Sequence, residues 1–392
     1  MNNMEQKNLL ELFGGCGGLG YGFHNNNFNI VCCNELEKQI GETYKYNYPK
    51  SNVIIGDITK NEIKKQIYET FSEKKCHLII GGPPCVAYSL SGKRDSRDPR
   101  GQLFKDYIET VTYLQPEICI MENVKGILNM LHDKDELNKE EQIQANKHYE
   151  LEKIKIDLEN KNKHKTITED EKKELSKIKK EIKISEINMS NIRIKVSEKI
   201  KNTFDKIGYN VEYKLLNSAN YGVPQLRERV IFIAIRKDIK VDITYPTETH
   251  CKNGSESKKK WVSVKDAIDD LKNKEQDQNL SHIFTKHSTE FIEKIKNTQC
   301  GKSVNPKYSE SNFKCIPDLP SNTVKENHGA VFVHYEKNRS MTPRELARLQ
   351  SFPDTFIFKG TKASILKQLG NAVPCLLSEA LAKNIVDIYN KI

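Results

Sequence analysis

Long apolar runs are absent from this sequence of 392 residues. No run approaches the ~20 residues that a membrane-spanning helix needs, so no membrane span is expected. The first ten residues are polar and lead directly into a glycine motif, which argues against a cleavable signal peptide. The ten cysteines are spaced irregularly without a CxxC pair, so no metal site is expected. These absences predict a cytoplasmic protein with reduced thiols.

The formal net charge is +10 at pH 7. The excess of Lys and Arg is spread thinly, and its densest parts flank two arginine-rich motifs at 225–229 and 339–348. This distribution fits a polyanionic partner gripped at selected points, and it also fits ordinary solvation of a protein surface. The length is sufficient for one large domain and a smaller one.

Residues 7 to about 130 alternate β-like runs with helical patterns. This alternation predicts an α/β fold with a parallel sheet and helices on both of its faces. Ligands bind at the carboxyl ends of the strands in such sheets, which is where small and acidic residues fall here. The predicted strands are 8–13, 29–34, 52–57, 77–81 and 118–122, and the predicted helices include 38–48 and 61–71.

Glycine and proline are absent from residues 131–200, where 33 of 70 residues are charged. Apolar residues recur there at coiled-coil spacing in two sets, separated by a polar break at 160–166. Thr168 and Glu171 form a capping box at the start of the second set. The pattern predicts a hairpin of two helices, each about 45 Å long at ~1.5 Å per residue. Its role is open between a structural insertion and an arm that grips DNA or a partner. The two apolar sets are Leu151, Ile154 and Leu158, and Leu175, Ile178 and Ile182.

Three further parts follow this hairpin. The first returns to the strand and helix pattern, the second is irregular and polar, and the third is mostly helical. The irregular part predicts a smaller domain with little repetitive structure. In the last part, Thr342-Pro343-Arg344-Glu345 supplies the N-cap, N1 proline and capping box of a helix that reaches about Ser351. The three parts are 201–236, with strands at 209–217 and 230–235, then 237–338, and 339–392.

A glycine-rich loop follows the first predicted strand, in the sequence Glu11-Leu-Phe-Gly-Gly-Cys-Gly-Gly-Leu-Gly20. Glycines let the backbone turn sharply and approach a ligand closely. The loop fits a dinucleotide fingerprint as well as a methionine-derived cofactor, so by itself it does not separate the two. Glu35 ends the next strand, where a carboxylate can accept ribose hydroxyls, and Asp57 ends the third, near an adenine amino group. Three such strand ends in succession predict a nucleoside site.

Cys85 follows two prolines in Gly81-Gly-Pro-Pro-Cys85. Most cysteines are small buried hydrophobes, but a rigid Pro-Pro turn is a poor place to bury one. We therefore predict that Cys85 is a nucleophile, which acts as the thiolate and needs positive surroundings.

Two further polar motifs lie at predicted strand ends. Glu122 is a candidate acid that hydrogen-bonds the ring nitrogen of a heterocycle, although a glutamate alone is usually solvated or paired. Arg227 and Arg229, at i and i+2 of a predicted strand, would share one face. They could hold an anion or a carbonyl oxygen, or they could form a structural ion pair with Glu228 or another acid.

In this order the motifs resemble those of the DNA cytosine-5 methyltransferase family. The similarity covers about 220 residues at both ends of the chain and implies a Rossmann-like catalytic domain that uses S-adenosyl-L-methionine. The matching motifs are the glycine loop, Asn34-Glu35, Gly56-Asp57-Ile58, Pro83-Pro84-Cys85, Glu122-Asn123-Val124, Gln225-x-Arg227-x-Arg229, Arg339 to Pro353, and Gly370-Asn371-Ala372-Val373-Pro374.

The resemblance implies a role for each matching residue. Cys85 would attack carbon 6 of a flipped cytosine, Glu122 would contact ring nitrogen 3 and the amino group, and Arg229 would hold the 2-carbonyl oxygen, supported by Arg227. Flipping is required because a stacked base cannot be reached. The residues implied to line the cofactor pocket are Phe13, Gly15, Gly17, Gly18, Leu19, Glu35, Asp57, Ile58, Pro83, Leu103, Asn371 and Val373.

The partner implied by the resemblance is double-stranded DNA, read by residues 237–338 as the target-recognition domain. A cognate restriction endonuclease is compatible with the pattern, and a monomer is expected. Two departures stand out: Leu36 replaces a common aromatic beside adenine, and the insertion 131–200 is not a usual family feature. The alternatives are a tRNA cytosine methyltransferase, a nicotinamide oxidoreductase and a non-catalytic DNA-binding relative.

Overall fold

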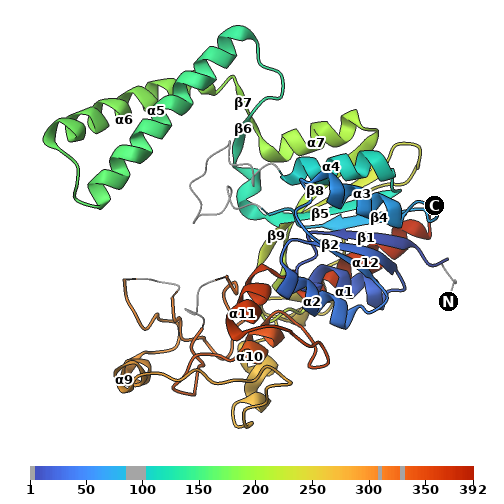
Figure 1. Cartoon of the computed structure of the whole chain (residues 1–392). Helices are drawn as coiled ribbons and strands as arrows, with labels where there is room; N and C mark the ends of the chain where they lie inside the picture. The colour runs from blue at the N-terminus through green and yellow to red at the C-terminus, as the bar shows by residue number, and fades with distance from the viewer. Residues whose placement is uncertain (1–4, 85–102, 308–310, 327–331) are drawn as a thin grey trace. The chain divides into compact units, whose positions relative to one another are not determined.

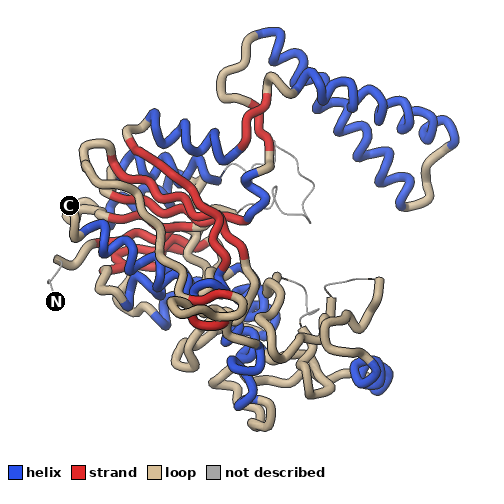
Figure 2. The backbone as a smooth tube through the Cα atoms, turned by 180° about the vertical axis from the view of Figure 1, so that it is seen from behind, coloured by secondary structure: helices blue, strands red, loops and turns tan. Residues whose placement is uncertain are grey.

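The computed structural model describes residues 5–84, 103–307, 311–326 and 332–392. Its centre is a sheet of seven strands in the order β3-β2-β1-β4-β5-β9-β8. All neighbours pair in parallel except at β9, which is antiparallel to both β5 and β8. Figures 1 and 2 show the strands side by side in this sheet. The strands are β1 (Asn8–Leu12), β2 (Asn29–Glu35), β3 (Asn52–Ile55), β4 (Leu78–Gly81), β5 (Ile118–Val124), β8 (Tyr209–Asn217) and β9 (Glu228–Arg236).

Helices cover both faces of the sheet, as the alternating pattern predicts. In Figure 1, α3 and α4 lie against one face, and α1 and α12 lie against the other. Strands that are covered on both faces are made mostly of apolar residues. In this sheet Leu9, Leu78 and Ile120 are fully buried. The helices of this part are α1 (Gly18–Asn25), α2 (Lys38–Asn47), α3 (Asn61–Thr70), α4 (Leu103–Leu114), α7 (Val196–Lys206), α10 (Pro343–Leu349), α11 (Lys362–Asn371) and α12 (Cys375–Tyr389).

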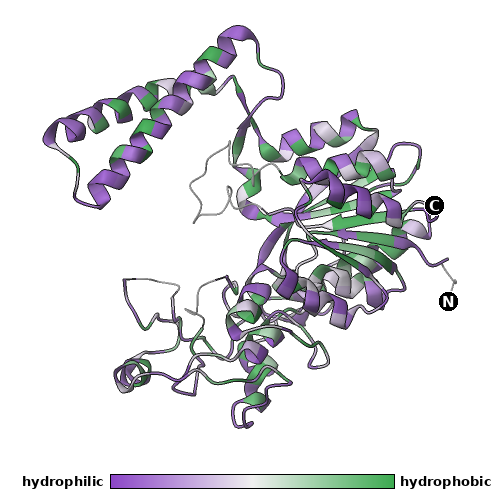
Figure 3. Ribbon diagram, viewed as in Figure 1, coloured by the Kyte–Doolittle hydropathy of each residue, from purple (hydrophilic) through white to green (hydrophobic). Residues whose placement is uncertain are grey.

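A second compact unit contains Gly126–Thr203. Its helices α5 (Lys139–Lys163) and α6 (Glu169–Met189) pack along each other above a short ribbon of β6 (Leu131–Asp133) and β7 (Arg193–Lys195). At ~1.5 Å per residue they are about 38 and about 32 Å long, shorter than the sequence predicts. In the ribbon of Figure 3, most of the residues in these two helices are coloured as hydrophilic.

The apolar seam of these two helices follows the predicted coiled-coil spacing in all but one position. Leu158, Leu175, Ile178 and Ile182 form a buried cluster with Leu151 beside it. The prediction is wrong for Ile154, which is exposed and takes no part in this cluster. The capping box of Thr168 and Glu171 is confirmed, and a second one, Asn138 with Glu141, begins α5.

The region 237–338 has few regular elements in its described part. It contains β10 (His250–Cys251), β11 (Lys259–Lys260), α8 (Val264–Ile268), the short 3-10 turn η4 (Asp269–Leu271) and α9 (Thr289–Asn297), and it follows the 3-10 turn η3 (Ser218–Tyr221). After it, α10 begins at the predicted N-cap Thr342, with Pro343 in its first turn and Glu345 completing the capping box. That helix ends at Leu349, two residues before the predicted end.

Candidate active site

A carboxylate and a guanidinium meet where β5 and β9 run antiparallel. Glu122 lies near the end of β5, and Arg229 is the second residue of β9, opposite Val124. Arg229 Nε lies 2.7 Å from Glu122 Oε1, and the two side chains are only 12% and 11% exposed. At this low exposure each charge has its partner as the nearest compensating group. Two groups predicted to hold one heterocycle are therefore adjacent.

The start of the Pro-Pro turn is fixed against the same strand. A β-carbon placed on Gly82 would lie 3.0 Å from Glu122 Oε2, so the chain entering the turn passes directly beside the carboxylate. One residue further on, Asn123 Nδ2 donates a hydrogen bond of 3.2 Å to the carbonyl oxygen of Pro83. Cys85 itself lies outside the described residues. The turn that precedes it begins at the carboxylate of Glu122.

Arg227 occupies a different place from Arg229. The prediction that both lie on one strand face is wrong, because β9 begins at Glu228 and Arg227 precedes it. Its side chain is 2% exposed and donates to the carbonyl oxygens of Val324 (3.0 Å) and Gly370 (3.2 Å). Burial and the nearby Arg229 lower the pKa of this guanidinium well below its usual value. Arg227 thus holds protein segments together rather than facing an open site.

Of the alternative ion pair with Glu228 or another acid, the structure shows the second form for Arg229, which pairs with Glu122. Glu228 Oε2 pairs with Lys125 Nζ at 3.0 Å, and Arg229 meets only the backbone oxygen of Glu228. The acid that Arg229 finds is Glu122.

The glycine loop lies between the end of β1 and the start of α1. Gly15 and Gly17 have φ angles of 56° and 96°, in the left-handed region that glycine adopts without strain. A β-carbon on Gly15 would meet open space, so this part of the loop leaves room for a ligand. The N–H groups of Gly15 and Glu37 each donate to the Glu35 carboxylate at 2.9 Å.

These contacts make Glu35 a preorganised acceptor. Burial raises the pKa of its carboxyl group, and the two N–H donors oppose that rise. Each oxygen still has a lone pair for a hydroxyl group, which suits the ribose of a nucleoside. Asp57, after β3, accepts from the N–H of Thr59 at 3.0 Å. The residues present therefore fit a nucleoside cofactor.

A segment near the C-terminus packs against this loop. A β-carbon on Gly18 would collide with the carbonyl oxygen of Val373, so this carbonyl lies against the first turn of α1. Cys16 Sγ also lies 3.9 Å from the carbonyl oxygen of Gln368, in α11. Asn371 donates to Glu326 Oε2 at 2.8 Å.

The other predicted pocket residues have varied positions. Leu19 and Ile58 are buried, Phe13 has a positive φ of 55°, Leu103 begins α4, and Pro83 accepts from Asn123. Leu36, which stands where the motif resemblance leads us to expect an aromatic residue, is 64% exposed beside Glu35.

The sequence analysis did not predict a set of buried hydrogen bonds that holds the glycine loop in place. Glu11 is buried and accepts from Tyr44 Oη (2.5 Å) and from the N–H of Gly20 (3.1 Å), while Tyr48 Oη donates to the carbonyl oxygen of Gly17 at 2.6 Å. Burial raises the pKa of Glu11 to about 8. The available signal was an acid inside an otherwise apolar strand, which needs partners when buried.

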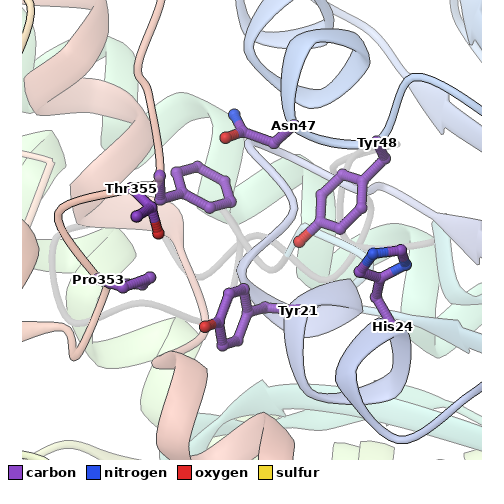
Figure 4. A pocket seen from close by; sticks show the side chains of 7 residues that line it. Tyr21, His24, Asn47, Tyr48, Pro353 and Thr355 are labelled. Carbon is purple, nitrogen blue, oxygen red and sulfur yellow. The ribbon is translucent and has the colours of Figure 1, made fainter.

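A surface pocket opens on the outer side of Tyr48. Figure 4 shows its lining, with the rings of Tyr21, Tyr48 and His24 around it. It contains none of the predicted site residues. The full lining is Tyr21, His24, Asn47, Tyr48, Pro353, Thr355 and Phe356.

Among the described residues, no group of three or more His, Cys, Asp or Glu side chains is arranged to hold a metal ion. No helix in the described ranges is both long and apolar enough to cross a membrane.

A family profile described as C-5 cytosine-specific DNA methylase matches residues 7–152 and 187–387. The chain belongs to this family. It is a DNA (cytosine-5-)-methyltransferase, and the family uses S-adenosyl-L-methionine as its methyl donor. The predicted family is confirmed, and its description names DNA, which favours DNA over tRNA as the substrate. The nicotinamide alternative is ruled out by the same match.

Relatives resemble the chain over nearly its full length. The type II methyltransferase M1.HphI of Haemophilus parahaemolyticus is 31% identical, over 96% of this chain and 86% of the relative. M.FnuDI of Fusobacterium nucleatum is also 31% identical, over 96% and 93%. An E. coli prophage protein, solved as a candidate DNA modification methyltransferase, has a TM-score of 0.67 at 22% identity, covering 98% and 100% of the two chains. At that identity the last comparison supports the methyltransferase fold alone.

The family profile leaves out 153–186. These residues include the last part of α5 and most of α6. The profile thus resumes close to the base of the two helices.

Proposed function

We propose that this DNA methylase flips its target cytosine into the space beside Glu122 and Arg229 and attacks it with Cys85. The observation that carries the proposal is the Glu122–Arg229 pair at 2.7 Å, next to the start of the Pro-Pro turn. In this arrangement the carboxyl group faces ring nitrogen 3 and the 4-amino group of the base, and the guanidinium faces the 2-carbonyl oxygen. Arg227 acts behind them, through the backbone that it holds.

The need for a nucleophile follows from the chemistry of cytosine, whose carbon 5 is a poor nucleophile. When the thiolate of Cys85 forms a bond to carbon 6, the electron pair of the 5,6 double bond makes carbon 5 reactive. Glu122 and Arg229 stabilise the charge that moves onto the ring. A bound donor would supply an electrophilic sulfonium methyl group for the new bond at carbon 5, with a neutral thioether as the other product. Loss of the carbon 5 proton to solvent then restores the double bond and expels the Cys85 thiolate.

We propose that the donor lies over the glycine loop. The N–H groups there and the N-terminus of α1 suit its carboxylate, Glu35 suits the ribose, and Asp57 suits the adenine amino group. The remaining pocket residues of this proposal are Phe13, Gly15, Gly17, Gly18, Leu19, Ile58, Pro83, Leu103, Asn371 and Val373. Because Leu36 is exposed where family members place an aromatic, adenine stacking is weaker here or comes from another residue.

For the domain organisation, we propose a catalytic domain formed by 1–130 and 201–236 and completed by 339–392. Residues 237–338 form the target-recognition domain, and 131–200 form a helical hairpin inserted into the catalytic domain. The many irregular segments of 237–338 suit base readout, because loops adapt to groove edges while Lys and Arg elsewhere hold phosphates. The relatives are named type II methyltransferases, which supports a paired restriction endonuclease. We propose that the methylase acts as a monomer.

The test is methyl transfer by Cys85→Ser against Cys300→Ser, a matched control because Cys300 is exposed and far along the sequence in the irregular region. Tritiated methyl incorporation into unmethylated genomic DNA should vanish in the first variant and persist in the second, while both still retard DNA in a gel. Turnover by Cys85→Ser would overturn the proposal. Bisulfite sequencing of DNA from a host expressing the chain then gives the recognised sequence.

A further inference from the structure

A buried knot of polar side chains lies behind the active-site pair. Its members are Gln225, Arg227 and Gln350, which are 0%, 2% and 0% exposed. Side chains of this polarity are rarely buried fully, because each of their donors and acceptors must then find a partner inside the protein. The hydrogen bonds that these three side chains make therefore determine how the knot is arranged.

The amide of Gln225 binds on both of its sides. Its oxygen accepts from the backbone N–H of Val324 at 2.9 Å. Its nitrogen donates to Gln350 Oε1 at 2.9 Å and to the carbonyl oxygen of Leu349 at 3.1 Å. One side chain thus links the segment around Val324 to the end of α10.

The amide of Gln350 carries the link onward. Its nitrogen donates to the carbonyl oxygen of Leu369 at 2.5 Å, near the end of α11. Arg227 makes a second link between the same two segments, because its two terminal nitrogens donate to the carbonyl oxygens of Val324 and Gly370. The two chain segments are therefore joined twice, once by two glutamines and once by an arginine.

The first of these segments lies within the irregular region. Ser321 and Leu226 pair through backbone hydrogen bonds, with Leu226 N–H donating to Ser321 O at 2.8 Å. Thr323 Oγ1 donates to the carbonyl oxygen of Leu226 at 2.8 Å. The segment 321–326 thus pairs with the chain that leads into Arg229, and it belongs to the proposed recognition domain.

The second segment is the one that closes the glycine loop. It runs from Leu369 to Val373, whose carbonyl oxygen lies against Gly18. The two segments also touch directly, because a β-carbon on Gly370 would collide with the backbone nitrogen of Glu326. Neither segment can shift alone without breaking buried hydrogen bonds, and a buried donor or acceptor left unpaired is costly.

We propose that Gln225 and Gln350 are positioning residues that couple DNA binding at 321–326 to cofactor binding at 369–373. This inference rests on the proposed function, because it assumes that DNA and the methyl donor bind at those two segments. Coupling of binding is reciprocal, so DNA should tighten the cofactor by the same factor as the cofactor tightens DNA. Couplings of this kind are about 5- to 150-fold.

The experiment compares Gln350→Met with Gln368→Met. Both positions are buried glutamines, 0% and 1% exposed, and both changes replace an amide with an apolar chain of similar length. Gln368 differs because, within the described ranges, its amide nitrogen donates to Lys359 O and Ser364 Oγ and has no bond to residues 321–326. S-Adenosylhomocysteine is titrated into each protein by calorimetry, with and without sheared unmethylated genomic DNA, and the ratio of the two Kd values is measured.

The wild type and Gln368→Met should both show a ratio of about 10 or more, within the usual range, and Gln350→Met should show a ratio below about 2. Gly370→Ala is the second variant, since it pushes Glu326 away and leaves the three knot side chains in place, and it should also reduce the ratio. A full ratio in Gln350→Met, an equal loss in Gln368→Met, or a wild-type ratio of one would each overturn the coupling. Failure of the proposed function looks different, because Cys85→Ser would then still transfer methyl groups, whatever ratio the wild type shows.

Discussion

Replacing Arg229 with methionine tests the charged pair at the centre of the site. The change removes a guanidinium and keeps a side chain of similar length. It leaves the Glu122 carboxylate, which is 11% exposed, without its closest cation. Breaking a buried pair from one side costs about 3–5 kcal/mol, because the remaining charge is uncompensated. The mirror change, Glu122→Met, should cost a similar amount.

The double variant carries the decisive information. With both charges gone, no unpaired group remains, and an apolar replacement of a buried pair is often neutral or stabilising. The double variant should therefore lose several kcal/mol less than the sum of the single variants. Urea-induced unfolding followed by circular dichroism measures the free energy of unfolding for all four proteins of the cycle.

Activity should follow a different pattern in the same four proteins. Each single variant should lower kcat by at least about 10²- to 10³-fold, which is the usual effect of removing one preorganised group that stabilises developing charge. The double variant should not recover activity even though it recovers stability. A single substitution that costs less than about 1 kcal/mol would refute the reasoning, because the pair would then behave as an exposed salt bridge.

Four further predictions concern the parts around the site. Because the pKa of Glu11 is raised from 4.5 to about 8, the native state keeps a proton that the unfolded state loses; stability should fall as pH rises through this window, and Glu11→Gln should flatten that slope in urea unfolding. Tyr48→Phe should weaken S-adenosylhomocysteine binding several-fold in calorimetry by releasing the glycine-loop carbonyl, whereas Tyr46→Phe, at an exposed position, should not. Gly22→Ala should cost about 1–3 kcal/mol in urea unfolding, because its β-carbon would collide with the backbone of α12. Replacing 139–189 with a short linker should leave S-adenosylhomocysteine affinity unchanged; a loss would show that the two helices support the cofactor site.

Local signals allowed much of the fold to be predicted. The strands of the first half and the start of α10 were predictable because hydrophobic runs, glycines and capping residues act over a few positions. Glu35 and Glu122 were predictable for the same reason, since a carboxylate at a parallel strand end lies at the ligand edge of the sheet. The partner of Glu122 followed from the motif resemblance rather than from spacing.

Long-range contacts were beyond sequence reasoning. Arg227 looked like the strand partner of Arg229, but its carbonyl partners are 97 and 143 residues away in the chain. The link from Gln225 to Gln350 spans 125 residues and has no local signature. Ile154 fits the heptad spacing but is exposed. Which face of a helix is buried depends on where its partner packs, and the spacing alone does not show this.

The central claim is that a thiol, a carboxyl group and a guanidinium act on one extruded cytosine. Its most direct test is to incubate the protein and S-adenosyl-L-methionine with DNA that carries 5-fluorocytosine, in which fluorine replaces the carbon 5 proton and cannot leave as a cation. The account predicts a complex that survives denaturant, with the nucleotide attached to the peptide that contains Cys85 in tandem mass spectrometry. A complex that dissociates in denaturant, or an attachment at another residue, would contradict it.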